Sequence, residues 1–299
     1  MTGRELLLTP TGRLRAPWRL VLFALAVLAS FVLVSALLDP ALAAINRAAG
    51  TRITAVGWRE ALALLLAHAL MLKWVERRSF ADVWLDRGAA RARVVTRGFA
   101  IGALAIGLPS LLLLGVHWLA PERSASGSWF GAAALLALTL APAALFEELL
   151  FRGYAFQALR DGIGVAGALV ATSLLFAAAH WQNPGANAEA LVNVGIAGLF
   201  IGAVLLATRS LYAAWAMHFA WNWTMAALFH MAVSGQALPT PGYVVRDAGP
   251  DWATGGDWGP EGGAAGALGM IGGLLFLARG AGRRGAFTVR PAGRGETTA

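Results

Sequence analysis

Long apolar runs separated by short polar segments make up most of the chain between residues 18 and 279. A helix needs about 20 mostly apolar residues to cross the hydrocarbon core of a bilayer. Runs of this kind predict eight membrane-spanning helices, the last of them rich in glycine. They cover residues 18–38, 57–75, 98–119, 129–151, 163–181, 190–208, 211–231 and 263–279. The pattern predicts an all-α fold, a polytopic transmembrane helical bundle with about eight spans.

The composition agrees with a chain embedded in lipid. Of the 299 residues, 58% are hydrophobic and 13% are charged, whereas soluble domains average roughly 45–50% and 25%. The chain has no cysteine, which excludes disulfides and thiolate metal sites. The net charge of +8 does not indicate nucleic-acid binding, because the basic residues lie in short segments between the apolar runs, where they set membrane topology.

The distribution of basic residues predicts the orientation. Most of the 24 lysine and arginine residues lie on one predicted side of the membrane. They are found before the first run, in the segment 73–97, at positions 152, 160 and 209, and after the last run. Cytoplasmic loops carry such an excess. We expect a multi-pass protein of the cell membrane with both termini cytoplasmic, which requires an even number of spans. The alanine-, glycine- and arginine-rich composition, with Lys73 as the only lysine, favours a bacterial source.

The chain divides into four predicted parts. Residues 1–128 hold the first transmembrane helices and a basic cytoplasmic linker at 76–97, and residues 129–231 form a core that carries the polar motifs described next. Residues 232–262 form a Gly/Pro-rich outer loop, and residues 263–299 form the last transmembrane helix and a basic cytoplasmic tail. The linker also holds aromatic residues, which fits either an interfacial helix on an anionic membrane surface or a solvated loop.

Two adjacent acids lie inside an apolar run. A charge at the bilayer centre costs at least a few kcal/mol, so Glu147 and Glu148 are functional candidates. Arg152 follows Glu148 by four residues, so the two can pair on one helix face. Glu147 is rotated by about 100° and lacks that partner. An unpaired, partly desolvated carboxylate suits a general base. The alternative is a Glu–Arg pair with a purely structural role.

Two histidines belong to similar short motifs. Phe176 lies one turn before His180, and Asn222 lies one turn after His218 on the same helix face. A single histidine in a span more often hydrogen-bonds to a neighbouring helix than catalyses. Three neighbouring helical segments that each contribute such a pair are a rarer pattern. The remaining histidines, His68, His117 and His230, are interpreted as structural.

These residues fit hydrolysis. A carboxylate and a histidine can activate a water, and a second histidine with a carboxamide can stabilise an oxyanion. Glu147, His180 and His218 are also a ligand set that suits zinc with an open position for water, so the cofactor is either none or a divalent metal such as zinc. A non-catalytic membrane scaffold and a proton-coupled small transporter remain alternatives. The sequence shows neither the internal repeats nor the paired interrupted helices that are frequent in transporters.

In these motifs the chain resembles the CPBP family, which includes type II CAAX prenyl endopeptidases and bacterial Abi-type membrane proteins. The family's motifs read Glu-Glu-x-x-x-Arg, Phe-x-x-x-His and His-x-x-x-Asn. They match three sets of residues over 129–231: Glu147, Glu148 and Arg152; Phe176 and His180; His218 and Asn222. The resemblance makes residues 129–231 a CPBP-like protease core.

The resemblance implies an intramembrane endopeptidase with a core like that of CAAX prenyl protease 2. Glu147 and His180 would activate water, and His218 with Asn222 would stabilise the oxyanion; Glu148, Arg152 and Phe176 would support them. Members are labelled metalloproteases, and a metal-free mechanism is also proposed. The implied partners are the bilayer and a membrane protein or lipid-associated peptide as substrate. Bacterial relatives are linked to bacteriocin immunity and peptide processing.

The depths of the motifs within the predicted spans do not match. If the fifth span begins near Ile163, His180 lies about 25 Å along it, whereas Glu147 and His218 lie nearer the cytoplasmic ends of their spans. The site closes only if the fourth and fifth helices are offset, tilted or broken.

Overall fold

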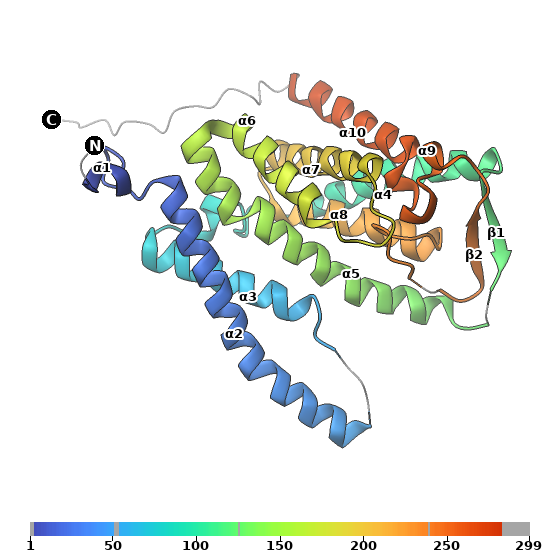
Figure 1. The fold of residues 1–299 in the computed structure, drawn as a ribbon, viewed down its shortest axis with the longest axis horizontal. Coiled ribbons are helices and arrows are strands. Elements are labelled where there is room, and N and C mark those ends of the chain that lie inside the picture. Colours follow the sequence, from blue (N-terminus) through green and yellow to red (C-terminus); the bar gives the residue numbers. More distant parts are fainter. Residues whose placement is uncertain (1–2, 51–53, 125, 239, 283–299) are drawn as a thin grey trace.

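The computed structural model describes residues 3–50, 54–124, 126–238 and 240–282, and it is mostly helical (Figure 1). The long helices are α2 (Ala16–Ala49), α4 (Ala92–Gly115), α5 (Trp129–Arg152), α6 (Tyr154–Ala179), α7 (Ala188–Thr208) and α10 (Ala264–Gly282). Shorter helices are α1 (Gly3–Leu7), α3 (Trp58–Ala69), which continues as a π-helix over Leu70–Val75, and α8 (Leu211–Trp223), which continues as a π-helix over Thr224–Leu228. The predicted basic tail beyond residue 282 lies outside the described residues.

Four helical stretches in the described chain are long and apolar enough to cross a membrane. They are Ala16–Ala49, Ala92–Gly115, Trp129–Ala179 and Ala188–Thr208. The third stretch contains both α5 and α6. All eight predicted runs are helical over most of their length, but the number that cross the bilayer stays a prediction.

Several boundaries differ from those predicted. Helix α2 runs eleven residues further, to Ala49, and its distal part projects away from the bundle (Figure 1). Helix α4 begins at Ala92 instead of residue 98. A two-stranded antiparallel sheet, β1 (Leu119–Arg123) with β2 (Tyr243–Asp247), departs from a purely α-helical fold. Pro121 lies in β1, where proline is tolerated because both strands of a two-stranded sheet are edge strands.

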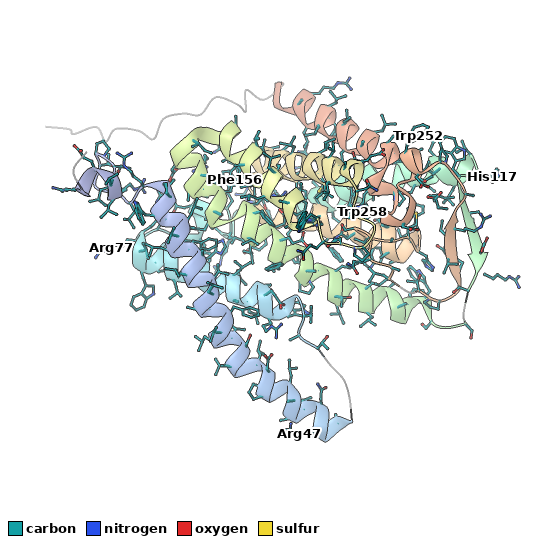
Figure 2. The ribbon with its side chains drawn as sticks, viewed as in Figure 1. Arg47, Arg77, His117, Phe156, Trp252 and Trp258 are labelled. Atoms are coloured by element: carbon teal, nitrogen blue, oxygen red, sulfur yellow. The ribbon has the colours of Figure 1, made fainter. Side chains whose placement is uncertain are left out.

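Both predicted loops are more ordered than expected. Residues 232–262 contain β2, α9 (Asp251–Thr254) and short 3₁₀-helices at Gly256–Trp258 and Pro260–Gly262. Trp258 is buried among the helices (Figure 2). The basic linker contains a 3₁₀-helix, Phe80–Val83, which buries Val83, and its contact with the membrane surface stays a prediction. The linker also caps α8, because the main-chain oxygen of Trp84 accepts from Leu211 N at 3.1 Å.

Small residues let helix α4 pack closely on α8. Gly98 and Gly102 face the carbonyl oxygens of Ala213 and Met217, and a Cβ on either glycine would overlap those oxygens. This glycine pair at i, i+4 follows the small-residue pattern by which helices associate in membranes. The close approach fixes α8, which carries His218 and Asn222, against the bundle.

Indole groups hold helix α5 near the two glutamates. Pro142 has no N–H, so the carbonyl oxygen of Leu138 lacks its usual helical donor. The indole Nε1 of Trp58 in α3 donates to that oxygen at 3.1 Å. From α8, Trp215 Nε1 donates to the carbonyl oxygen of Ala141 at 2.7 Å. These bonds tie α5 to α3 and α8 about two turns before Glu147.

Two backbone breaks resolve the depth mismatch. Helix α5 ends at Arg152, and Gly153 adopts a non-helical conformation before α6 begins. His68 stabilises this break, because its Nε2 accepts from Tyr154 N at 2.9 Å. Within α6, Gly164 has φ 78° and ψ 171°, which breaks the helix at the turn marked α6 in Figure 1. The chain reverses there, and the second part of α6 brings His180 back to α5.

Candidate active site

The end of helix α5 carries a fully buried ion pair. Glu148 Oε1 and Arg152 Nη1 lie 3.3 Å apart, as the i, i+4 spacing predicts, with side-chain exposures of 0% and 1%. Arg152 Nη2 also donates to the main-chain oxygen of Gly198 in α7 at 3.2 Å. The guanidinium lies 4.3 Å from the ring centre of Phe176, a cation–π contact. Arg152 therefore joins α5, α6 and α7.

His218 is oriented by the same carboxylate. Its Nδ1 lies 2.8 Å from Glu148 Oε1. A carboxylate only accepts hydrogen bonds, so Nδ1 carries a proton, and Nε2 is left for a second partner. The sequence predicted Arg152 as the partner of Glu148 but not His218, because contacts between α5 and α8 leave no trace in helical spacing.

His180 is oriented by its own helix. It caps the C-terminus of α6, and its Nδ1 lies 2.8 Å from the carbonyl oxygen of Phe176. A carbonyl also only accepts, so Nδ1 is again the donor and Nε2 is free. The Phe176 ring contacts both imidazoles, with centroid distances of 4.7 Å to His180 and 5.9 Å to His218. Phe176 thus contacts Arg152 and both histidines.

Glu147 faces both free imidazole nitrogens. Its Oε2 is 4.0 Å from His180 Nε2 and 3.8 Å from His218 Nε2. This oxygen is buried and has no hydrogen-bond partner among the described residues. The side chain as a whole is 26% exposed, in contrast to the fully buried Glu148. The structure therefore brings together Glu147, His180 and His218 from α5, α6 and α8.

Asn222 joins this group through a small cavity. The cavity has a volume of about 30 Å³ and is lined by His180, His218 and Asn222, together with residues of α7 and of the 232–262 segment. A site of this size holds one water molecule. The carboxamide and both imidazoles therefore border one space large enough for a small reacting group.

The arrangement does not form a metal site as it stands. Zinc with bonds of about 2.0–2.1 Å needs neighbouring tetrahedral ligand atoms about 3.3 Å apart, and the Glu147 oxygen is 3.8 and 4.0 Å from the two nitrogens. Over the ranges that the structure describes, no three His, Asp or Glu residues are grouped as metal ligands. Glu147, His180 and His218 have the right donor types for zinc but not the spacing.

Sequence reasoning missed three contributors to the site. Ser234 and Glu261, from the 232–262 segment, line the same cavity as the histidines. A single glutamate in a glycine-rich stretch carries no periodic signal, so nothing in the sequence distinguished Glu261 from the other acids of that segment. Gly198 was also missed, because it contributes only its main-chain oxygen.

Comparison with protein families gives one match, and it begins two residues before α5 and ends just after α8. Residues 127–224 match the family model of the Rce1-like type II CAAX prenyl endopeptidases. This Rce1-like segment contains all seven motif residues and confirms the resemblance seen in the sequence. Comparison with curated proteins and with solved structures gives no match. Together with its apolar helices, the Rce1-like segment marks the chain as a membrane protein related to proteases.

Proposed function

We propose that the protein is an intramembrane endopeptidase that hydrolyses peptide bonds with Glu147 as general base. The observation that carries the proposal is the convergence of three groups from three helices. One oxygen of Glu147 lies within 4.0 Å of both Nε2 atoms, and each imidazole is held by a separate hydrogen bond at Nδ1. A scaffold role does not require two imidazole nitrogens directed at an unpaired carboxylate.

Charge balance explains how the group handles a proton. With both glutamates ionised and Arg152 charged, the buried cluster carries one net negative charge. A single proton shared by Glu147, His180 and His218 makes it neutral, which a low-dielectric site favours. With that proton on His218 Nε2, the proton that Glu147 takes from water has the Nε2 of His180 at 4.0 Å to receive it.

The reaction then needs few further groups. Water loses a proton to Glu147 as its oxygen bonds to the scissile carbonyl carbon, and the carbonyl oxygen becomes an oxyanion. Asn222 Nδ2 donates a hydrogen bond to that oxyanion, and His218 Nε2, which carries the proton that neutralises the resting cluster, donates a second. When the C–N bond breaks, the proton held by Glu147 and His180 passes to the leaving nitrogen. Glu148 and Arg152 hold His218 in place throughout.

The substrate class follows from where the site lies. Glu147 lies within, and His180 directly after, the stretch Trp129–Ala179, which is long and apolar enough to cross a membrane, so a soluble peptide has no direct route to them. We infer that the substrate is a membrane protein or a lipid-associated peptide. Cleavage takes place in the cell membrane of a bacterium, with both termini of the enzyme in the cytoplasm.

The decisive experiment compares cells that carry wild type or Glu147→Gln at equal abundance. Glu147→Gln keeps the side-chain shape but removes the base, so we expect cleavage to be lost while membrane insertion is retained. Terminus-selective mass spectrometry of membrane and secreted peptides would reveal new termini only with wild type. Those termini would also identify the substrates.

A matched control replaces a glutamate outside the site, so that the effect of losing the general base can be told from the effect of losing any glutamate. Glu189 is exposed in the first turn of α7, outside the site, and Glu189→Gln should give the wild-type peptide set. Identical peptide sets for wild type and Glu147→Gln would contradict the protease and favour the scaffold.

A further inference from the structure

The 232–262 segment makes a chain of hydrogen bonds between the two catalytic histidine segments. Glu261 accepts three hydrogen bonds: Oε2 from Trp221 Nε1 at 2.7 Å, and Oε1 from Ser234 N at 2.5 Å and Ser234 Oγ at 2.8 Å. Both carboxylate oxygens are therefore occupied. Trp221 directly precedes Asn222 on α8, so this carboxylate fixes the helix at the predicted oxyanion residue.

Ser234 continues the chain of bonds toward His180. Its main-chain oxygen accepts from Asn183 Nδ2 at 3.0 Å. Asn183 belongs to the turn that ends α6, where its N donates to the His180 oxygen at 3.1 Å. Ser234 adopts a left-handed φ of 48°, and Gly235 has φ 76°. A Cβ at Gly235 would overlap the Pro184 oxygen, so the two segments pack in direct contact.

Ser234 and Glu261 also line the 30 Å³ cavity together with His180, His218 and Asn222. The hydrogen bonds from Asn183 through Ser234 and Glu261 to Trp221 thus span the cavity from the end of α6 to α8. No other hydrogen bonds described for the chain link the His180 turn to the segment around Asn222.

We propose that Glu261 is a positioning residue of the protease, which sets the separation between His180 and the His218–Asn222 face of α8 through Ser234. The proposal rests on the protease function proposed above. The positioning role requires a carboxylate at residue 261, because hydrogen-bond donors approach both of its side-chain oxygens. A glutamine at 261 would direct its NH₂ group at either the indole N–H or the Ser234 N–H, donor against donor.

Measurements of kcat and KM test the positioning role of Glu261, because a positioning residue affects kcat more than KM. Loss of one charge-assisted hydrogen bond should lower kcat of Glu261→Gln about tenfold and leave KM nearly unchanged, since no substrate contact is removed. Trp221→Phe deletes the donor at Oε2, so the glutamine NH₂ no longer opposes a donor there. Glu261→Gln should therefore cost less in the Trp221→Phe background than in wild type. Asp257→Asn removes an exposed carboxylate of the same segment and should leave kcat unchanged.

A second measurement does not depend on proteolysis. The chain has no cysteine, so spin labels can be placed on cysteines introduced at Trp181, beside His180, and at Leu228, after α8; both positions are exposed. In the full-length protein in lipid nanodiscs, Glu261→Gln should broaden the distance distribution between the labels, and Asp257→Asn should not. Ser234→Ala keeps the main-chain N–H of residue 234 and should broaden the distance distribution less than Glu261→Gln. This variant replaces Glu261→Gln in the measurement if Glu261→Gln does not fold.

The outcomes separate the two proposals. An unchanged distance distribution, with kcat of Glu261→Gln within about twofold of wild type, would overturn the positioning role and leave the protease intact. A broadened distribution in a protein whose wild type cleaves nothing would uphold the link between His180 and α8 and refute the protease.

Discussion

Among the side chains of the site, Glu148 is the one whose single buried oxygen contacts two functional partners. Its buried Oε1 serves both Arg152 and His218, at 3.3 and 2.8 Å. One carboxylate therefore neutralises a cation and also selects the tautomer of an imidazole. Glu147, one residue earlier, has neither task and is partly exposed. The adjacent acids differ because successive helical residues point about 100° apart.

Replacing Glu148 should damage the fold as well as the chemistry. Glu148→Gln leaves the buried Arg152 without a counter-charge, and breaking a buried pair in this way costs about 3–5 kcal/mol. We expect a lower amount in the membrane and a lower thermal unfolding midpoint, together with loss of activity. Glu147→Gln should lose activity only. A Glu148→Gln protein as abundant and as stable as wild type would contradict this division of roles.

At the scale of helices, the position of α5 depends on hydrogen bonds that ordinary helix geometry does not supply. Pro142 frees the Leu138 oxygen, and Trp58 of α3 provides the missing donor. Trp215 and Trp223 of α8 donate to the oxygens of Ala141 and Ala133. Helix α5 is thus held from two sides along its length, which fixes the glutamates relative to His218.

The pairing of Pro142 with Trp58 predicts a coupled loss of stability. Trp58→Phe removes one hydrogen bond and should destabilise the protein by about 1 kcal/mol. Pro142→Ala restores a main-chain N–H that can donate to the Leu138 oxygen, so Trp58→Phe should cost less in that background. A double-mutant cycle of thermal unfolding in detergent measures the difference. Equal costs in both backgrounds would show that Trp58 does not serve the freed carbonyl.

The close contact of α4 with α8 predicts a glycine requirement. Gly102→Ala should destabilise the protein, because the new Cβ would overlap the Met217 oxygen and force the helices apart. Gly115→Ala is the matched control, since no atom lies within 4 Å of the position of its Cβ. Thermal unfolding should show a lower midpoint for Gly102→Ala alone. Equal midpoints for the two variants would refute the close contact.

Local periodicity allowed part of the site to be predicted from the sequence. The positions of the apolar helices, the Glu148–Arg152 pair and the shared face of His218 and Asn222 follow from helical spacing and hydropathy. The contacts between α5 and α8, the reversal at Gly164 and the role of Glu261 depend on tertiary packing. Gly162 and Gly164 lie close together in the sequence, and this pair was the available signal for the break in α6.

The whole molecule has a predicted orientation that two single-cysteine variants can test. Arg87 and Glu122 are exposed at opposite ends of α4 and lie in the basic linker and in β1. Positive-inside topology places Arg87 in the cytoplasm and Glu122 outside. A membrane-impermeant maleimide should label Glu122→Cys in intact cells and label Arg87→Cys only after permeabilisation. Wild type has no cysteine and gives the blank; the reverse labelling pattern would invert the topology.

The bonds of Glu261 and Ser234 also limit which part of the chain can be transferred to another protein. All seven motif residues lie within residues 127–224, which makes that stretch look like a transferable cassette. Yet Trp221 and Asn183 bond to partners at 261 and 234, and α8 rests on glycines of α4. A chimaera that grafts 127–224 alone into another membrane protein would inherit every recognisable motif without the neighbours that align them. Transplantation has to include the chain on both sides, from α4 through α10.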